Sequence, residues 1–188
     1  MATQLATHRT TAELEAGLGE ILRAPASDGV VELIVRRPAE NEREVLAEGH
    51  LDLVEGLVGD TWRLRGSKRT ADGSSHPDMQ LNVMSARVVD LVAAGERERW
   101  ALAGDQLYVD LDLSEENLPP GTRLALGSAV IEVTDEPHTG CAKFSARFGA
   151  AAHTFVNTKA HRHLRLRGLN ARVVEPGTVR AGDAIRKL

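Results

Sequence analysis

The sequence predicts a mostly β protein, a barrel or a sandwich, with a helical extension at its N-terminus. Two observations carry this prediction. Short runs of β-branched and other apolar residues recur along most of the 188-residue chain, and glycine, proline, asparagine or aspartate turns separate them. A single run with helix signals precedes these predicted strands. We therefore expect residues 1–27 to form the helical extension and residues 28–188 to form one β domain.

The predicted N-terminal helix covers residues 10–23. Thr10 can cap it, Leu14 and Leu18 recur at helical spacing, and Pro25 stops it. The first predicted strand follows at residues 29–38, a β-branched run that ends at a proline.

The middle of the chain alternates between polar and apolar segments. Residues 39–49 are acidic and are expected to begin as a loop, and the polar residues 66–78 form the longest predicted loop. A strand at residues 80–84 then leads into a helix at residues 86–94, which Gly95 ends. The remaining predicted strands are residues 106–111, 123–126, 129–134, 163–166, 171–175 and 184–186.

Composition excludes several classes of protein. Apolar residues make up 42% and charged residues 27%, values typical of a soluble globular protein. A net charge of −4 and an aromatic content of 3% disfavour nucleic-acid binding. No apolar stretch is long enough to span a membrane or to act as a secretory leader, so we expect a cytoplasmic protein without a membrane partner. One cysteine excludes an internal disulfide and a paired-cysteine metal site.

The charge is spread unevenly along the chain. Residues 140–188 hold ten lysines and arginines against two acidic residues, a net charge of +8, so residues 1–139 carry −12. Such an asymmetry indicates either an anion site in the basic part or basic strands that pack beside acidic ones.

Cys141 is the first candidate for chemistry. The strand predicted at residues 129–134 should deliver it onto a loop. A thiol acts as a nucleophile or metal ligand only as the thiolate, and nearby positive charge lowers its pKa. His138 and Lys143 are close enough in sequence to supply that charge, and Arg147 can approach as well.

Other interpretations of this cysteine remain open. Free cysteine is among the most buried residue types, so Cys141 can also be an inert core residue. A Cys–His hydrolase is disfavoured because neither the papain-like nor the caspase-like signature surrounds Cys141. Phosphate-binding glycine motifs and the GxSxG elbow are absent too.

The histidines give weaker signals. His161 and His163 are two apart and would share one face of a strand, where they could hold a metal ion with His153 or a carboxylate. The ordinary alternative is a pair of surface or core histidines. His76 lies on the long polar loop and can reach into a site.

Several segments in order resemble the MOSC domain, named for the C-terminal domain of molybdenum cofactor sulfurases. Cys141 lies where the cysteine of that family is expected. The segments are the strand at residues 31–38, the Gly-Leu-Val-Gly-Asp turn at residues 56–60, residues 80–91, Gly104-Asp105 with residues 118–124, residues 127–134, and residues 167–174 with 177–183.

The resemblance implies a barrel-like, mostly β fold with a few short helices. It implies a cysteine that binds molybdenum in the molybdenum cofactor (molybdopterin) or carries sulfur as a persulfide. Some relatives reduce N-hydroxylated compounds with this cofactor, which gives the alternative of a reductase. The larger relatives carry a separate pyridoxal-phosphate domain, and this chain has no room for it, so pyridoxal phosphate is not expected. Expected partners are a small-molecule cofactor or substrate and a protein that donates sulfur or electrons.

These inferences define a set of candidate site residues. Cys141 is the expected metal ligand or sulfur carrier, and His138 and Lys143 are expected to assist it by lowering the thiol pKa. Phosphate on the cofactor suits arginine side chains. The residues expected to bind the cofactor are Arg147, Arg167, His76 and Asn82. A non-catalytic binding module with an inert, buried cysteine is the second alternative.

Overall fold

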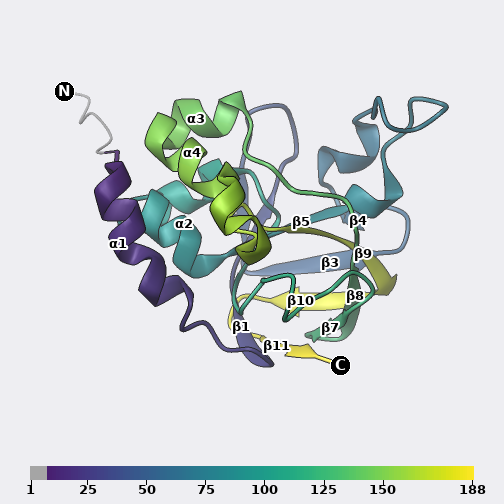
Figure 1. Cartoon of the computed structure of the whole chain (residues 1–188). Helices are drawn as coiled ribbons and strands as arrows, with labels where there is room; N and C mark the ends of the chain where they lie inside the picture. The colour runs from purple at the N-terminus through teal and green to yellow at the C-terminus, as the bar shows by residue number, and fades with distance from the viewer. Residues whose placement is uncertain (1–7) are drawn as a thin grey trace.

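The long first strand closes a β-barrel because it pairs along its length with three other strands. β1 (Asp28–Arg36) pairs with the last strand, β11 (Ala184–Lys187), at its start, with β6 (Leu107–Asp110) in its middle and with β2 (Glu44–Leu46) at its end. This computed structural model describes residues 8–188. It confirms the predicted barrel, with its α-helices gathered on one side (Figure 1).

Seven strands form the closed ring, in the order β1, β11, β7, β8, β9, β5 and β6. All neighbours are antiparallel except β5 and β6, which are joined by a helical crossover. A second sheet of three strands, in the order β10-β3-β4, packs against the barrel. The strands not yet given are β3 (Glu48–Asp52), β4 (Gly56–Leu57), β5 (Leu81–Ser85), β7 (Arg123–Leu126), β8 (Ala129–Val133), β9 (Leu169–Glu175) and β10 (Gly177–Arg180).

A bulge in β1 sorts its side chains between two cores. The register with β6 shifts between Val31 and Leu33, so Val31 and Ile34 both face the barrel interior. Leu33 and Val35 face the opposite side, where they pack against the helices. The barrel wall therefore separates an aliphatic interior from a second core that also contains all three phenylalanines and Tyr108.

Four α-helices cover that outer face of the barrel (Figure 1). α1 packs against α2 and α4, and α3 packs against α4. The α-helices are α1 (Thr11–Ile21), α2 (Ala86–Val92), α3 (Ala142–Phe148) and α4 (Ala150–Asn157), and the 3-10 turns are η1 (Thr61–Leu64), η2 (Pro77–Met79), η3 (Arg97–Ala103) and η4 (Lys159–Leu164). No helix within residues 8–188 has the length and apolar character needed to cross a membrane.

The N-terminal helix forms where the sequence predicts it. The Thr10 hydroxyl accepts from the Glu13 backbone N–H, and the Glu13 carboxylate accepts from the Thr10 backbone N–H, which is a complete capping box. Leu14 is fully buried in the outer core, whereas Leu22 at the C-cap is 59% exposed. The domain boundary at residue 27 stays a prediction.

One predicted strand is wrong. Residues 163–166 are not extended, because η4 covers their first part and Arg165 adopts a left-handed conformation with φ of 48°. The turn then depends on Gly168, whose φ is 105° and where a Cβ atom would lie 2.2 Å from the Val83 carbonyl oxygen. His161 and His163 consequently do not share the face of a strand. The prediction also missed α3, α4, β2 and β3.

We predict that Leu14→Ala lowers the free energy of unfolding by about 2–5 kcal/mol, because it leaves a cavity between α1 and the outer core. Leu22→Ala, on an exposed side chain of the same segment, should change it by less than about 0.5 kcal/mol. Urea unfolding of both variants measures the difference. Equal effects would contradict the packing of α1.

Candidate functional site

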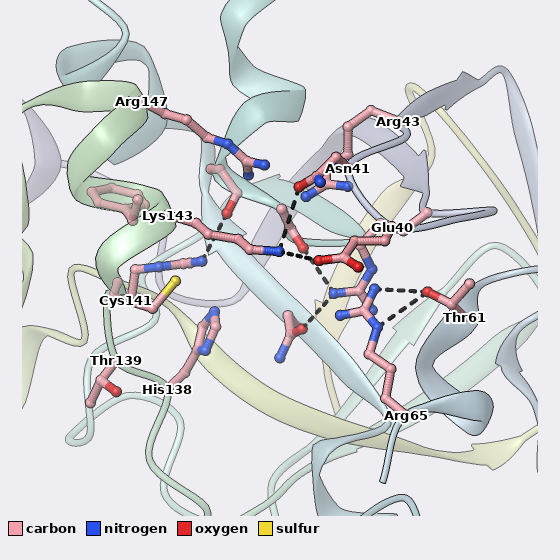
Figure 2. A pocket seen from close by; sticks show the side chains of 16 residues that line it. Glu40, Asn41, Arg43, Thr61, Arg65, His138, Thr139, Cys141, Lys143 and Arg147 are labelled. Atoms are coloured by element: carbon pink, nitrogen blue, oxygen red, sulfur yellow. Dashed lines mark hydrogen bonds and ion pairs between the residues drawn. The ribbon is translucent and has the colours of Figure 1, made fainter. Parts of the chain in front are cut away.

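A cavity of about 540 Å³ opens between the end of β1, the start of β6 and the loop that leads into α3 (Figure 2). Most of the side chains that line it are polar or charged, and six of them are arginines or lysine. The lining residues are Arg37, Glu40, Asn41, Arg43, Thr61, Arg65, Asn82, Ala103, Gly104, His138, Thr139, Cys141, Lys143, Phe144, Arg147 and Arg167.

Arg37 forms one half of the cavity floor, and the carboxylate of Asp60 neutralises its charge. Its Nη2 and Nε atoms donate to the two carboxylate oxygens of Asp60 at 2.8 Å each, and both side chains are at most 5% exposed. Burial alone would raise the pKa of Asp60, but the hydrogen bonds and charge of Arg37 hold it below its ordinary value. Nη1 of Arg37 donates to the Gly104 carbonyl at 2.9 Å and to Asn82 at 3.1 Å.

Asn82 connects this floor to the loop that carries Cys141. Its side-chain amide donates to Asn170 at 2.6 Å, and the Asn170 amide donates to the Glu136 carbonyl at 3.0 Å. Asn170 is fully buried. A continuous chain of hydrogen bonds therefore fixes the cysteine loop relative to Arg37.

Arg167 forms the other half of the floor with a second buried aspartate. Nη1 of Arg167 donates to both carboxylate oxygens of Asp105, at 2.8 and 2.9 Å, and Nη2 donates to the Ala103 carbonyl. His138 contacts the same carboxylate through Nε2 at 2.8 Å. Burial alone would raise the pKa of Asp105, but the charges and hydrogen bonds of Arg167 and His138 hold it far below its ordinary value.

Three further arginines face the cavity without an acidic partner among residues 8–188. Arg65 bonds only to the Thr61 hydroxyl, Arg147 to the Leu102 carbonyl and Arg43 to the Glu42 carbonyl.

The backbone at Gly104 brings two of these arginines together. A Cβ atom on Gly104 would lie 3.3 Å from Arg43 and 3.9 Å from Arg147, so both guanidinium groups converge there. Gly104 has a φ of 91°, a conformation that favours glycine. Burial, followed by the charges of Arg147 and Arg37, lowers the pKa of Arg43. Guanidinium groups without a salt-bridge partner give this cavity a chemistry that suits an anion.

Cys141 is exposed at the edge of the cavity, directly before α3. The preceding residue, Gly140, is fixed by α4: its N–H donates to Asn157 at 2.9 Å, and its carbonyl lies 3.1 Å from Nε2 of His153. Lys143 reaches across the opening and donates to Glu40 at 2.9 Å (Figure 2). The thiol is therefore held on an ordered loop and remains accessible.

The structure brings most of the predicted site residues together. Cys141, His138, Lys143, Arg147, Arg167 and Asn82 all line the cavity. His76 does not line it: its ring caps η2 and lies 3.4 Å from Glu136.

The contacts of His138 and Lys143 do not match their predicted role, which was to lower the pKa of the Cys141 thiol by positive charge. His138 is bonded to Asp105, and its burial, followed by the charge of Arg167, lowers its pKa and disfavours the cationic form. Lys143 is paired with Glu40. No group of three histidine, cysteine, aspartate or glutamate side chains within residues 8–188 could hold a metal ion, so His161 and His163 do not form a metal site there.

Six charged residues of the site were not predicted from the sequence. Arg37 and Asp60 were noted only within a strand and a turn, and Asp105 only beside a glycine. Glu40 and Arg43 lie in the segment at residues 39–49 that was expected to begin as a loop, and Arg65 lies where no element was predicted. What these residues share is their distance along the chain from Cys141: residues 37–65 approach it only because β1 crosses the barrel next to β6.

The fold and the site together are a closed β-barrel with an exposed cysteine at the edge of a cavity rich in arginine. The chain belongs to the MOSC domain family, whose family model matches residues 70–186. No curated protein sequence matches the chain.

Solved structures agree on the fold. The YuaD protein from Bacillus subtilis is 18% identical, with a TM-score of 0.63 over 84% of this chain and 94% of that one. YiiM from Escherichia coli is 21% identical, with a TM-score of 0.53 over 85% of this chain and 69% of that one. At these identities the likeness shows a shared architecture.

We predict that Asp60→Asn lowers the free energy of unfolding by about 3–5 kcal/mol, because it leaves Arg37 buried without its counter-charge. The control is Glu48→Gln, which breaks the exposed pair with Arg180 and should cost less than about 1 kcal/mol. Chemical denaturation at neutral pH measures both. A small effect of Asp60→Asn would show that Arg37 does not depend on this carboxylate.

We also predict that acid destabilises the fold in two stages. His138, whose pKa is lowered by folding, favours the folded state above the unfolded value of about 6.5, and this contribution is lost as the pH falls below it. Asp60 and Asp105, with lowered pKa values, stabilise the fold above about pH 4, and this contribution is lost at lower pH.

The free energy of unfolding measured between pH 8 and 3 tests this pH dependence. In His138→Gln the decline just below about pH 6.5 should become shallower, while the decline below about pH 4 remains. An unchanged slope in the first interval would contradict a neutral, buried His138.

Proposed function

We propose that the chain binds the molybdenum cofactor, an anionic pterin compound, in the cationic cavity, with Cys141 as the protein ligand to molybdenum. One observation carries this proposal. The only cysteine of the chain opens into a cavity in which three arginines lack an acidic partner among residues 8–188. A thiolate is the soft ligand that such a metal centre can accept, and arginine suits the phosphate group of the pterin.

The donor set of the cavity fits such a ligand. Nε of Arg43 and Nε of Arg167 are sealed from solvent and have no hydrogen-bond partner. Buried polar atoms are normally satisfied, so unsatisfied guanidinium donors at a cavity wall favour a missing acceptor. An anion near Gly104 would also relieve the mutual repulsion of Arg43 and Arg147.

When bound, the cofactor supplies two-electron redox chemistry at its metal. The chain's own residues bind and orient it. Cys141, at the N-cap of α3, would hold the metal. Arg147 on the same helix, and Arg43 and Arg65 across the cavity, would hold the anionic group (Figure 2). The Lys143–Glu40 pair narrows the entrance between them.

Two activities are compatible with this binding mode. In the first, the protein carries the cofactor or carries sulfur on Cys141 as a persulfide. In the second, it is a reductase of N-hydroxylated compounds that retains the cofactor. The alternative of a binding module with a buried cysteine is wrong about burial, because Cys141 is exposed.

We predict that protein made in a host that synthesises the cofactor contains molybdenum and pterin, and that Cys141→Ser loses most of the molybdenum. Arg43→Gln with Arg147→Gln should lower the pterin content although the thiol is intact, because the anionic group loses two of its charge partners. Elemental analysis and pterin fluorescence measure the two components.

Arg186→Gln is the matched control, because Arg186 is an exposed arginine paired with Asp28 far from the cavity. It should retain both components. Metal and pterin content that is equal in all four proteins would refute the proposed function. If loaded protein turns over hydroxylamine-type substrates, the reductase is supported; if it does not, the carrier is supported.

A further inference from the structure

His138 stands between a buried carboxylate and the cavity. Its side chain is 12% exposed, it lies three residues before Cys141, and it lines the cysteine cavity. It also lines a second cavity of about 410 Å³, which shares Thr139 and Arg167 with the first. The ring is therefore anchored to Asp105 through Nε2, while part of the side chain remains open to a cavity.

The anchor fixes which ring nitrogen carries the proton. Asp105 is fully buried and is held ionised by Arg167, so its carboxylate can only accept hydrogen bonds. Nε2 of His138, 2.8 Å from that carboxylate, must donate. In the neutral ring, Nδ1 then carries a lone pair and acts as an acceptor.

Nδ1 has no partner of its own. No hydrogen bond joins it to any of residues 8–188, and it is not among the polar atoms sealed from solvent. It therefore faces a space that water or a ligand can enter. An Asp–His pair with the second nitrogen open is the arrangement that lets a histidine exchange protons with a bound molecule.

Few other acceptors in the cysteine cavity are free. The Glu40 carboxylate is bonded to Lys143, the Asn82 oxygen to Arg37 and the Thr61 hydroxyl to Arg65. The other polar groups in the wall are mainly guanidinium donors, which suit an anion. Nδ1 of His138, a residue that lines the cavity, thus remains as an acceptor with no partner among residues 8–188.

The charges around His138 favour its neutral form at rest. Asp105, on the loop before β6, favours the imidazolium ion, whereas burial, Arg167 before β9 and Arg37 at the end of β1 oppose it. On its own loop, Glu136 forms an ion pair with Arg69 and lies 3.4 Å from His76. Together, burial and the neighbouring charges lower the pKa of His138 and so favour its neutral form.

We propose that His138 is the acid–base residue of the cysteine cavity, and that its Nδ1 atom accepts the proton of an N–H or O–H group on the ligand bound there. The proton leaves the ligand atom, whose electron pair stays behind, and forms an Nδ1–H bond. Nε2–H stays on Asp105, and the resulting imidazolium ion is stabilised by that carboxylate. Asp105 is the positioning residue. This inference rests on the proposed function only in taking the cavity as the ligand site.

NMR of the full chain labelled with ¹⁵N-histidine, without cofactor, tests the resting state. His138→Gln identifies the signal. We expect the neutral Nε2–H tautomer at pH 7 and a pKa below the ordinary value of about 6.5. Asp105→Asn, if folded, should lower this pKa further because the charge that favours the imidazolium ion is removed. An Nδ1–H tautomer, or an imidazolium ion at pH 7, would overturn the proposal on wild-type protein alone.

A pair of small probes tests the open nitrogen. Acetohydroxamic acid carries N–H and O–H donors, whereas N,N-dimethylacetamide has a similar size and carries none. We expect millimolar acetohydroxamic acid to shift the Nδ1 resonance of His138 toward its protonated position, and N,N-dimethylacetamide to leave it in place. His153, which contacts Gly140 on the same loop but does not line the cavity, is the control signal and should not move.

Equal shifts with the two probes, or no shift with either, would refute the proposed role of Nδ1. None of these readouts requires molybdenum or turnover. Failure to take up the cofactor would therefore refute the proposed function and leave the proposed role of His138 intact. An Nδ1–H tautomer would refute the role of His138 and leave the proposed function intact.

Discussion

The burial of two arginines, each with its own aspartate, is the constraint on which the site depends. Arg37 with Asp60 and Arg167 with Asp105 join segments that are far apart in the sequence, and all four side chains are almost inaccessible to solvent. A buried ion pair is not in itself a source of stability, but breaking one is costly. The two pairs therefore specify one arrangement of the barrel end rather than adding much to its stability.

This arrangement separates two kinds of positive charge. The floor arginines have donated most of their hydrogen bonds to aspartates and backbone carbonyls and act as structure. The arginines above them are bonded only to neutral groups and keep their charge for a ligand. Hydrogen bonds through Asn82 and Asn170 join the cysteine loop to the same floor. The thiol of Cys141 is therefore held at a fixed position relative to the arginines that have no salt-bridge partner.

The sequence predicted the elements whose signals are local. β7 agrees with its predicted bounds, and α1 and β5 differ by one or two residues, because β-branched runs, caps and turns mark them. The strand at residues 163–166 failed because alternating basic and apolar residues mimic a strand, whereas the left-handed turn at Arg165 depends on tertiary contacts. Six of the seven predicted site residues line the cavity, but its floor was missed, because Asp60 and Asp105 acquire their roles only when the barrel closes.

The most direct test is an anomalous difference map of crystals of cofactor-loaded protein, measured at the molybdenum edge. We expect one strong peak within the cavity at bonding distance from the sulfur of Cys141, with density for the anionic group at Arg43, Arg65 or Arg147. A molybdenum peak elsewhere on the barrel, or a cavity that stays empty while the cysteine is unmodified, would contradict the proposed function.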